Sequence, residues 1–286
     1  MNRTRDLASS FTVLAPDGAM VHAREFPSRS GDRDAPTLVL AHGWTLSHGS
    51  WLPVIERLQE AHDVRVVAYD QPGHGRSTLG APRPTIRDLG HVLAAVLDRT
   101  VGRGPVVLGG HSMGGMTIMA FAGLHPDRVA DQVRGVGLVS TAAIVRGHLS
   151  VPGQSLLMGT LAAVPGRLRP PPVPAAVFAR TIFGPGADKG GVRAATRIMN
   201  RTPARTTGRF FAALDAHDER ESLAVLGQVP TEVLVGTRDI LTPRRWAKEI
   251  ADAIPGSRLT EFEGRGHMLT YEETDAVAAS LGRLLG

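Results

Sequence analysis

The stretch that decides the fold is Val106–Pro126, VVLGGHSMGGMTIMAFAGLHP, in which a β-branched apolar segment runs into a glycine-rich turn and then into an apolar helical pattern. Residues Gly110–Gly114 fit the pattern G-x-S-x-G, and they stand between the predicted strand and the predicted helix. A serine in such a tight, strained turn needs glycines two positions before and after it, because strand and helix must approach closely. We therefore predict that Ser112 is a nucleophile.

Alternating strand and helix patterns surround this turn. A hairpin with its turn at Pro16–Gly18 comes first, and helix patterns separate the strands that follow. This alternation predicts an α/β fold with a mostly parallel, doubly wound sheet, whose core is formed by residues 1–140 and 230–286. Continuous apolar runs, typical of strands covered on both faces, occur at residues 37–41, 64–69, 105–109, 133–140 and 231–236.

Residues 141–229 interrupt the alternation, since prolines gather at 165–174 and no run is typical of a buried strand. We predict that this insertion is a helical cap over the C-terminal edge of the sheet, where such folds bind ligands. Helices are expected at 187–200 and 202–216, the second capped by Thr202 with Pro203 at its first position. Six apolar residues of the cap are candidates for a wall of the site: Leu156, Leu157, Met158, Phe178, Ile182 and Phe183.

A serine hydroxyl needs a base to take its proton, and the base needs a group that fixes its tautomer. Asp239 follows a predicted strand in VLVGTRDILTP, and His267 follows the last predicted strand in EFEGRGHMLT. The order serine, acid, histidine is the one this kind of fold requires, and all three residues would emerge at the same sheet edge. We predict a catalytic triad of Ser112, Asp239 and His267.

A tetrahedral intermediate needs two hydrogen-bond donors for its oxyanion. The backbone N–H of Met113, directly after the nucleophile, is the first candidate. The N–H of Trp44, in the HGW turn after the first buried parallel strand, is the second. Gly43 would allow this turn to come close to the serine.

Composition narrows the remaining possibilities. The chain has no cysteine, which excludes disulfides, thiolate metal sites and cysteine nucleophiles. No run of about 18 apolar residues is present, and the N-terminal stretch shows no signal-peptide pattern, so we expect a cytoplasmic protein without stable membrane insertion. The net charge is +5, but no basic run is interleaved with aromatic residues, and we expect no nucleic-acid partner. The oligomeric state stays open.

The histidines outside the triad show no metal-ligand spacing, and we expect neither a metal nor a cofactor. His42 and His74 are expected to hydrogen-bond loop backbone. Structural or solvated roles are predicted for six further histidines: His22, His62, His91, His125, His148 and His217.

Taken together, these motifs resemble those of a known protein family. The chain resembles the α/β-hydrolase superfamily through five landmarks that occur in the family's order: HGW at 42–44, YDQPGHGRS at 69–77, GHSMGG at 110–115, VGTRDILTP at 235–243 and GRGHML at 264–269. GHSMGG is similar to the motif of serine esterases and monoacylglycerol-lipase-like enzymes. The resemblance implies hydrolysis of a small carboxylic ester, which could include an acyl lipid or an anionic ester, through an acyl-enzyme.

The resemblance leaves other reactions open on the same residues. Lactone, thioester or C–C bond hydrolysis and a haloperoxidase-like side activity are alternatives, and so is a binding protein on a hydrolase scaffold. Serine at position 112 argues against epoxide hydrolases and haloalkane dehalogenases, which use a carboxylate. His111 argues against ring-cleavage C–C hydrolases, which usually carry asparagine there.

The predicted cap is strongly basic. Residues 141–209 contain nine arginines and Lys189 against a single acid, Asp188. A solvated helix face is the simpler interpretation. The alternative is that some of these arginines attract an anionic substrate or an acidic lipid surface.

Overall fold

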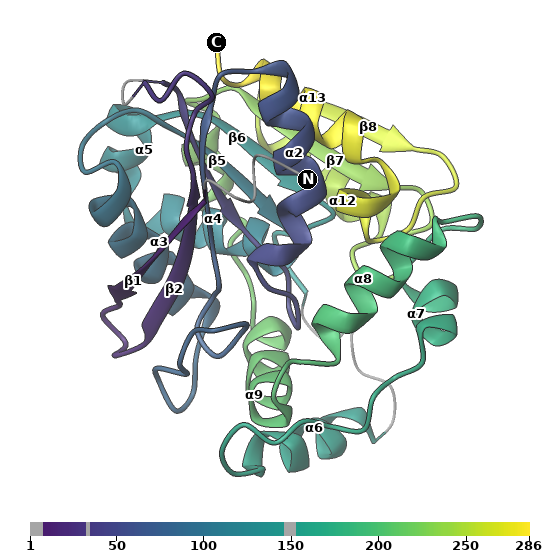
Figure 1. The fold of residues 1–286 in the computed structure, drawn as a ribbon. Coiled ribbons are helices and arrows are strands. Elements are labelled where there is room, and N and C mark those ends of the chain that lie inside the picture. Colours follow the sequence, from purple (N-terminus) through teal and green to yellow (C-terminus); the bar gives the residue numbers. More distant parts are fainter. Residues whose placement is uncertain (1–7, 33–34, 146–152) are drawn as a thin grey trace.

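The structure, a computed structural model, describes residues 8–32, 35–145 and 153–286 of the chain (Figure 1). Within these residues, eight strands form one sheet with the order β1-β2-β4-β3-β5-β6-β7-β8. The hairpin strands β1 and β2 are antiparallel to their neighbours, and β3 to β8 run parallel, so the predicted fold class is confirmed. The strands are β1 (Ser9–Leu14), β2 (Met20–Phe26), β3 (Thr37–Ala41), β4 (Arg65–Tyr69), β5 (Val106–His111), β6 (Val133–Val139), β7 (Thr231–Gly236) and β8 (Arg258–Phe262).

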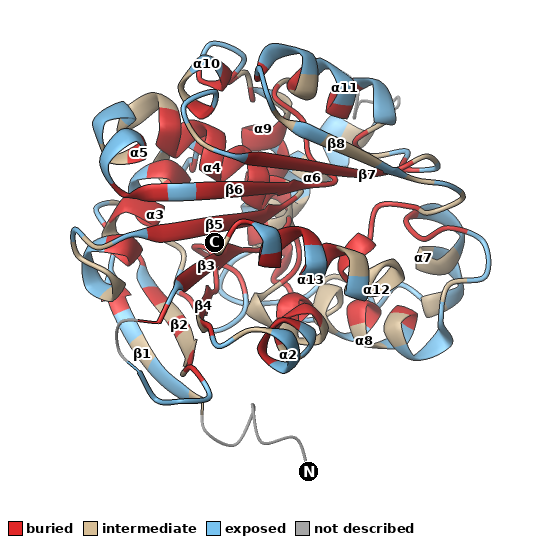
Figure 2. Ribbon diagram, turned by 90° about the horizontal axis from the view of Figure 1, so that it is seen from above, coloured by how far each residue is buried: buried red, intermediate tan, exposed pale blue. Residues whose placement is uncertain are grey.

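Two helical layers cover the sheet, and Figure 2 shows the buried strands between them. One layer consists of α3 (Ile86–Thr100), α4 (Met113–Leu124), α5 (Pro126–Gln132), α10 (Leu223–Leu226) and α11 (Arg244–Ala253). The other consists of α2 (Leu52–Ala61), which follows the short helix η1 (His48–Trp51), together with α12 (Leu269–Glu272) and α13 (Thr274–Arg283).

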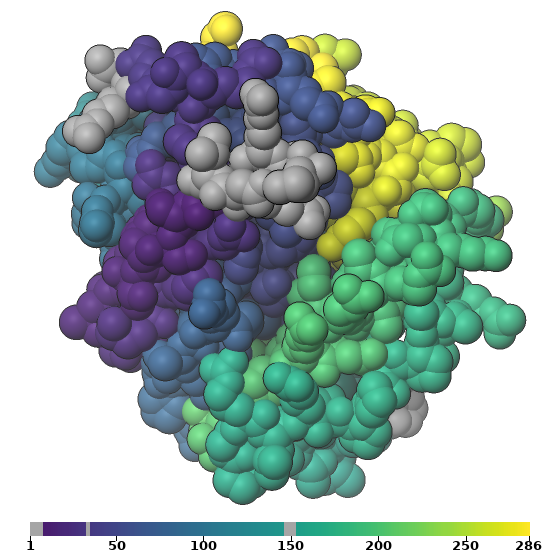
Figure 3. Space-filling model, viewed as in Figure 1, coloured from purple at the N-terminus to yellow at the C-terminus, as the bar shows by residue number. Residues whose placement is uncertain are grey.

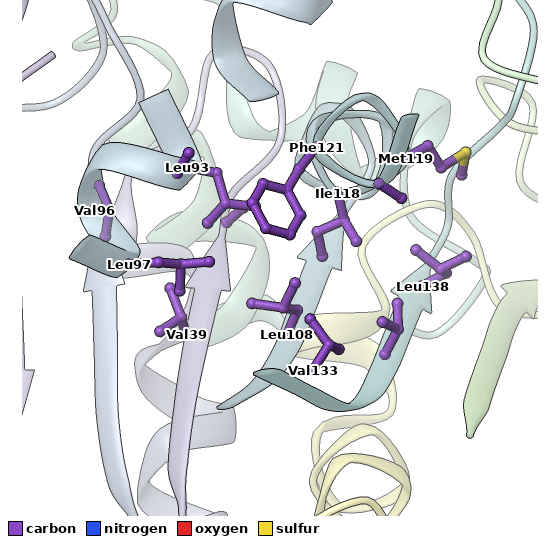
Figure 4. Close-up of a cluster of buried hydrophobic side chains, with 14 of the residues drawn as sticks. Val39, Leu93, Val96, Leu97, Leu108, Ile118, Met119, Phe121, Val133 and Leu138 are labelled. Atoms are coloured by element: carbon purple, nitrogen blue, oxygen red, sulfur yellow. The ribbon is translucent and has the colours of Figure 1, made fainter. Parts of the chain in front are cut away.

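Side-chain alternation along the parallel strands fills both layers. In β3, Val39 packs with the cluster under α3 and α4, whereas Leu38 and Leu40 pack with the cluster under α2 and α13. Figure 4 shows the first cluster, in which Phe121 of α4 lies among side chains from α3 and the strands. Because both faces are covered, the strands contain apolar residues at nearly every position, which is the pattern that predicted them.

The insertion between β6 and β7 is helical in its described part. It contains α6 (Gln154–Ala163), α7 (Ala175–Thr181), α8 (Lys189–Met199) and α9 (Ala204–Asp215) before α10. In Figure 1 these four helices lie beyond the edge of the sheet where the parallel strands end. Gly208 of α9 meets the α6 backbone, since a Cβ there would overlap Met158 O and Ala162 N. The later helix α10 packs against α4, with Leu223 and Leu226 in the core cluster.

Two local predictions need correction. Thr202 does not cap α9: its hydroxyl donates to the Thr45 carbonyl (2.7 Å), and Pro203 is the N-cap, so the helix begins one residue late. The sequence pattern of residues 270–285 indicates one closing helix, but the chain forms two there, α12 and α13, separated at Glu273. The division into core and cap at 141 and 229 stays a prediction.

Candidate active site

Ser112 is held in a strained turn between β5 and α4. Its φ and ψ are 54° and −121°, in a region that non-glycine residues rarely adopt. A Cβ on Gly110 would overlap the backbone of Gly114, and a Cβ on Gly114 would overlap the carbonyl of Ala41. The Ser112 N–H donates to Val139 O at 2.9 Å, which ties the turn to β6. The glycines are therefore needed for the close approach of strand and helix, as the motif indicates.

Asp239 and His267 come from the loops that follow β7 and β8. His267 Nδ1 lies 2.8 Å from Asp239 Oδ2, so the ring donates Nδ1–H to this carboxylate. Oδ1 accepts the N–H groups of Leu241 and Thr242 at 2.9 Å each, and the Thr242 hydroxyl donates to Oδ2 at 2.7 Å. The carboxylate thus has four hydrogen-bond donors at a buried site.

These partners also decide the charge of Asp239. Burial by itself raises the pKa of the carboxyl group. The adjacent His267 and the hydrogen bonds from His267 and Thr242 act in the opposite direction and prevail, so the pKa of Asp239 lies below its usual range. Asp239 is therefore ionised at neutral pH and holds His267 in the tautomer whose Nε2 is free to accept a proton.

One cavity joins the predicted nucleophile and base. Ser112, His267 and Thr242 line a cavity of about 390 Å³ between the sheet edge and the cap. Asp239 lies behind His267 and does not line it. Within the part of the chain that the structure describes, no Asp, Glu, Lys or Arg lines this cavity. Its surroundings are mainly apolar and include Leu46, Met116, Val145, Leu161, Met199, Leu214 and Met268.

The wall predicted from the cap is correct in half of its residues. Met158, Phe178 and Ile182 line the cavity. Leu156 and Leu157 are 78% and 56% exposed. Phe183 is buried among α7, α8 and the His267 loop instead.

The turn after β3 approaches the nucleophile closely. A Cβ on Gly43 would lie 3.1 Å from the Ser112 Cβ, and Gly43 and Trp44 both line the cavity. Met113 opens α4, and N–H groups in the first turn of a helix have no intrahelical acceptor. The two predicted oxyanion donors thus lie on segments that flank Ser112.

His42 shapes this turn as predicted. Its Nδ1–H donates to Gly43 O at 2.7 Å, and its Nε2 accepts the Gln71 N–H at 2.9 Å. Burial lowers the pKa of His42 to about 4, so the ring is neutral and makes both bonds. His74 plays a comparable part, donating Nδ1–H to Pro72 O at 3.0 Å.

His111 has a role that sequence reasoning missed. Its Nε2–H donates to the carbonyl of His267 at 2.9 Å, and so it connects the residue before the nucleophile to the predicted base. Burial, together with the nearby His267, lowers the pKa of His111 to about 3, so this ring is neutral. The available signal was a histidine at the end of a fully buried strand, directly before the serine.

The expectation that no histidine cluster has metal-ligand spacing was wrong. Among the described residues, His22, His48 and Asp70 bring their ligand atoms within 4.8 Å of one another. His48 Nδ1 lies 2.8 Å from Asp70 Oδ1, and His22 Nδ1 lies 3.4 Å from Oδ2. Oδ2 also accepts the Arg76 N–H at 2.9 Å, and the Arg76 guanidinium faces His22 Nε2. Hydrogen bonds from His48 and the Arg76 N–H occupy the Asp70 carboxylate, and the Arg76 guanidinium beside the cluster disfavours a bound metal ion. His148 lies outside the described residues.

The cap arginines stand apart from the cavity. Arg193, Arg197 and Arg201 are exposed on and just after α8, and Arg205 Nε donates to Val164 O at 2.9 Å. Arg146 lies outside the described residues. No described helix is long and apolar enough to cross a membrane.

The mostly parallel sheet between two helical layers, with a strained serine after β5, is typical of α/β hydrolases. Comparison with known proteins gives the family. Residues 38–280 match the alpha/beta hydrolase family, and the chain belongs to it. A pimeloyl-[acyl-carrier protein] methyl ester esterase of Xanthomonas campestris pv. campestris is 29% identical over 87% of this chain and 95% of its own length. The enol-lactonase of Burkholderia xenovorans LB400 has a similar structure, with a TM-score of 0.79, 26% identity, and coverage of 96% of this chain and 99% of the other.

A longer relative matches only in part. The dihydrolipoyllysine-residue acetyltransferase component of the acetoin cleaving system of Pseudomonas putida is 29% identical over 86% of this chain, which spans 62% of that protein's length. The family and these relatives support an enzyme of the α/β-hydrolase class.

Proposed function

We propose that the protein is a serine hydrolase that cleaves a carboxylic ester through an acyl-enzyme. The observation that carries this proposal is the arrangement around the cavity. Ser112, in its strained turn, and His267, hydrogen-bonded to the buried carboxylate of Asp239, open onto the same space. Nucleophile, base and orienting acid are the three parts that acyl transfer by serine requires.

In the proposed reaction, His267 Nε2 takes the proton of the Ser112 hydroxyl as its oxygen attacks the ester carbonyl. The backbone N–H groups of Met113 and Trp44 stabilise the resulting oxyanion, each worth about 3 kcal/mol in such sites. His267 returns the proton to the departing alcohol. It then deprotonates a water molecule, which attacks the acyl-enzyme, and it returns this proton to the Ser112 oxygen as the acid is released. The carboxylate of Asp239 stabilises the imidazolium at both stages.

The cavity favours an ester with an apolar acyl or alcohol part. A volume of about 390 Å³ lies within the range of small-molecule sites. The lining has no ionised carboxylate or ammonium group among the described residues, so a charged group within the cavity would lose hydration without gaining a partner. The proposed substrate is therefore uncharged around its ester bond.

Lactone hydrolysis is the second candidate, favoured by the similarity to the enol-lactonase. A lactone is a cyclic ester, and the same residues would open it. The difference lies in the released alcohol, which stays attached to the acyl group and must be accommodated in the cavity during deacylation.

A substrate panel tests the proposal. The wild-type protein and Ser112→Ala should be assayed with p-nitrophenyl esters of increasing acyl length and with aliphatic lactones, and Ser112 should be labelled with a fluorophosphonate. We expect labelling and ester turnover in the wild type and neither in the variant. Turnover of lactones alone would replace the first candidate by the second. Failure of Ser112 to react, with no turnover of any ester, would refute both.

A further inference from the structure

Exposed apolar side chains gather on one segment of the cap. We call residues 153–181, which comprise α6, α7 and the proline-rich connection between them, the outer cap segment. Neither helix buries a side chain fully. Among the described residues, eight large hydrophobic side chains are exposed, and five of them belong to this segment. The five are Leu156, Leu157, Leu168, Val173 and Val177.

The outer cap segment also forms the rim of the cavity. Met158 and Leu161 of α6 line the cavity, whereas Leu156 and Leu157 of the same helix are exposed to solvent. Val173 does both, since it lines the cavity and is 36% exposed. In Figures 1 and 3, α6 and α7 lie at the outer limit of the molecule, away from the sheet. The apolar lining of the cavity is therefore continuous with an apolar outer surface.

Positive charge accompanies this apolar surface. Arg169 and Arg180 are exposed within the segment, and the single acid of residues 141–209, Asp188, follows it. Arg167 is also part of the segment, and its guanidinium donates to the carbonyls of Gly75 and Ser77, which anchors the connection to the core. The exposed leucines and valines are thus interspersed with cations in a segment that itself contains no carboxylate.

We propose that the outer cap segment docks on an anionic phospholipid surface and that the substrate enters the cavity from that surface. This inference rests on the proposed ester hydrolysis, and it identifies the substrate as a lipid-borne acyl ester. Apolar side chains can enter the boundary between headgroups and acyl chains, and each arginine near an anionic surface adds attraction. A patch of this kind on a protein surface is typical of an interaction site.

The positive charge of the outer cap segment favours a lipid surface over a second copy of the chain as its partner. Two copies joined through this segment would gather the Arg169 and Arg180 side chains of both copies in one interface, with no carboxylate of the segment to pair with them. Lipid phosphates supply the missing negative charge. The apolar side chains also lie at the entrance through which an acyl chain would pass directly from lipid into the cavity.

Vesicle co-sedimentation tests the docking. The full chain should be mixed with vesicles of phosphatidylcholine alone and of phosphatidylcholine with phosphatidylglycerol. We expect binding to the anionic vesicles that weakens as salt is added. The double variant Leu156→Ser/Leu157→Ser should bind at least about tenfold more weakly. Arg169→Gln/Arg180→Gln should lose most of the preference for anionic vesicles.

The controls separate the two proposals. Leu14→Ser alters an equally exposed leucine on β1, and Arg134→Gln alters an exposed arginine at the opposite end of the sheet; both should bind vesicles as the wild type does. All four variants should hydrolyse a short, water-soluble ester at the wild-type rate. Equal vesicle binding by the leucine variant and by its control would overturn the docking proposal while ester turnover persists.

Two further outcomes count against docking. If the wild type binds neither type of vesicle, the proposal is wrong whatever the enzyme hydrolyses. If sedimentation velocity shows a dimer that Leu156→Ser/Leu157→Ser dissociates, the surface belongs to a second copy instead. Absence of ester turnover in the wild type, by contrast, would refute the proposed function and leave vesicle binding to be judged separately.

Discussion

The sheet edge and the cap of this protein are built in opposite ways. At the sheet edge, Asp239 accepts four hydrogen bonds, and His267 is held by Asp239 at its ring and by His111 at its carbonyl. A Cβ on Gly110 or Gly114 would not fit. In the outer cap segment, α6 and α7 bury no side chain fully, and Gly159 has no neighbour within 4 Å of the Cβ position. The first region leaves no freedom for substitution, because each of these residues makes a hydrogen bond or a close contact that holds the site together. In the second, side chains can change without disturbing a tightly packed interior, which suits the part in substrate binding that we propose for it.

The largest expected effect comes from the buried acid. Asp239→Asn would keep the shape of the side chain but remove the charge that fixes the His267 tautomer. We expect kcat for a water-soluble ester to fall by about a thousandfold or more. Circular dichroism should show a folded protein, and Asp252→Asn, on the surface of α11, should have full activity. A variant with unchanged kcat would show that Asp239 does not orient the base.

Alanine in place of glycine contrasts the two regions directly. Gly114→Ala places a Cβ on the Ala41 carbonyl, and we expect the free energy of unfolding to fall by about 3 kcal/mol. Gly159→Ala, in the open surroundings of α6, should instead raise it by about 0.5–1 kcal/mol, because alanine favours a helix. Urea unfolding of both variants measures these differences. Similar effects at the two positions would show that the sheet edge and the cap do not differ in this way.

Acid should destabilise the core through its buried imidazoles. Burial lowers the pKa of His74 from 6.5 to about 3, so the unfolded chain binds a proton that the folded chain does not. The free energy of unfolding therefore falls as the pH drops below 6.5, and continues to fall down to about pH 3.

For His74 this loss is about 2 kcal/mol between pH 7 and pH 5. Urea unfolding at the two pH values should show a smaller decrease for His74→Gln than for the wild type. Equal decreases would mean that His74 does not contribute.

A smaller effect is expected at His111, which acts on catalysis only through His267. His111→Leu removes the ring N–H that donates to the His267 carbonyl, and we expect kcat to fall about tenfold while KM stays within about twofold. His125→Leu, at the far end of α4, is the control. A change in KM alone would place His111 in substrate binding instead of in positioning the base.

The smallest effect concerns selectivity. Met158→Ala enlarges the cavity, and we expect the ratio of kcat/KM for long and short water-soluble esters to change by about threefold to tenfold. Leu157→Ala, one residue earlier on the same helix but exposed, should leave this ratio unchanged. If both variants behave alike, the inner side of α6 does not contact substrate.

Sequence patterns predicted the sheet edge better than the cap, for a physical reason. Each strand with two buried faces is apolar at nearly every position, and the glycines around Ser112 follow from local sterics. Asp239 and His267 could be located because residues that follow parallel strands emerge at one edge. These are short-range rules.

The features that were missed depend on contacts between distant segments. The bond from His111 to the His267 carbonyl joins residues 156 positions apart, and the cluster of His22, His48 and Asp70 joins β2, η1 and the loop after β4. On α6, apolar residues occur on all sides, so periodicity could not separate Met158, which faces the cavity, from Leu156 and Leu157, which face solvent.

Two hydrogen bonds between the turn after β3 and the cap limit how this scaffold can be re-engineered. The indole of Trp44 donates to Thr207 O at 3.2 Å, and Thr202 donates to the Thr45 carbonyl. A cap transplanted from a relative would have to supply both an acceptor and a hydroxyl at these places. Without them, the turn after β3, which lies against Ser112, would lose its contacts with the cap. Exchanging caps to obtain a new specificity would therefore lower turnover as well.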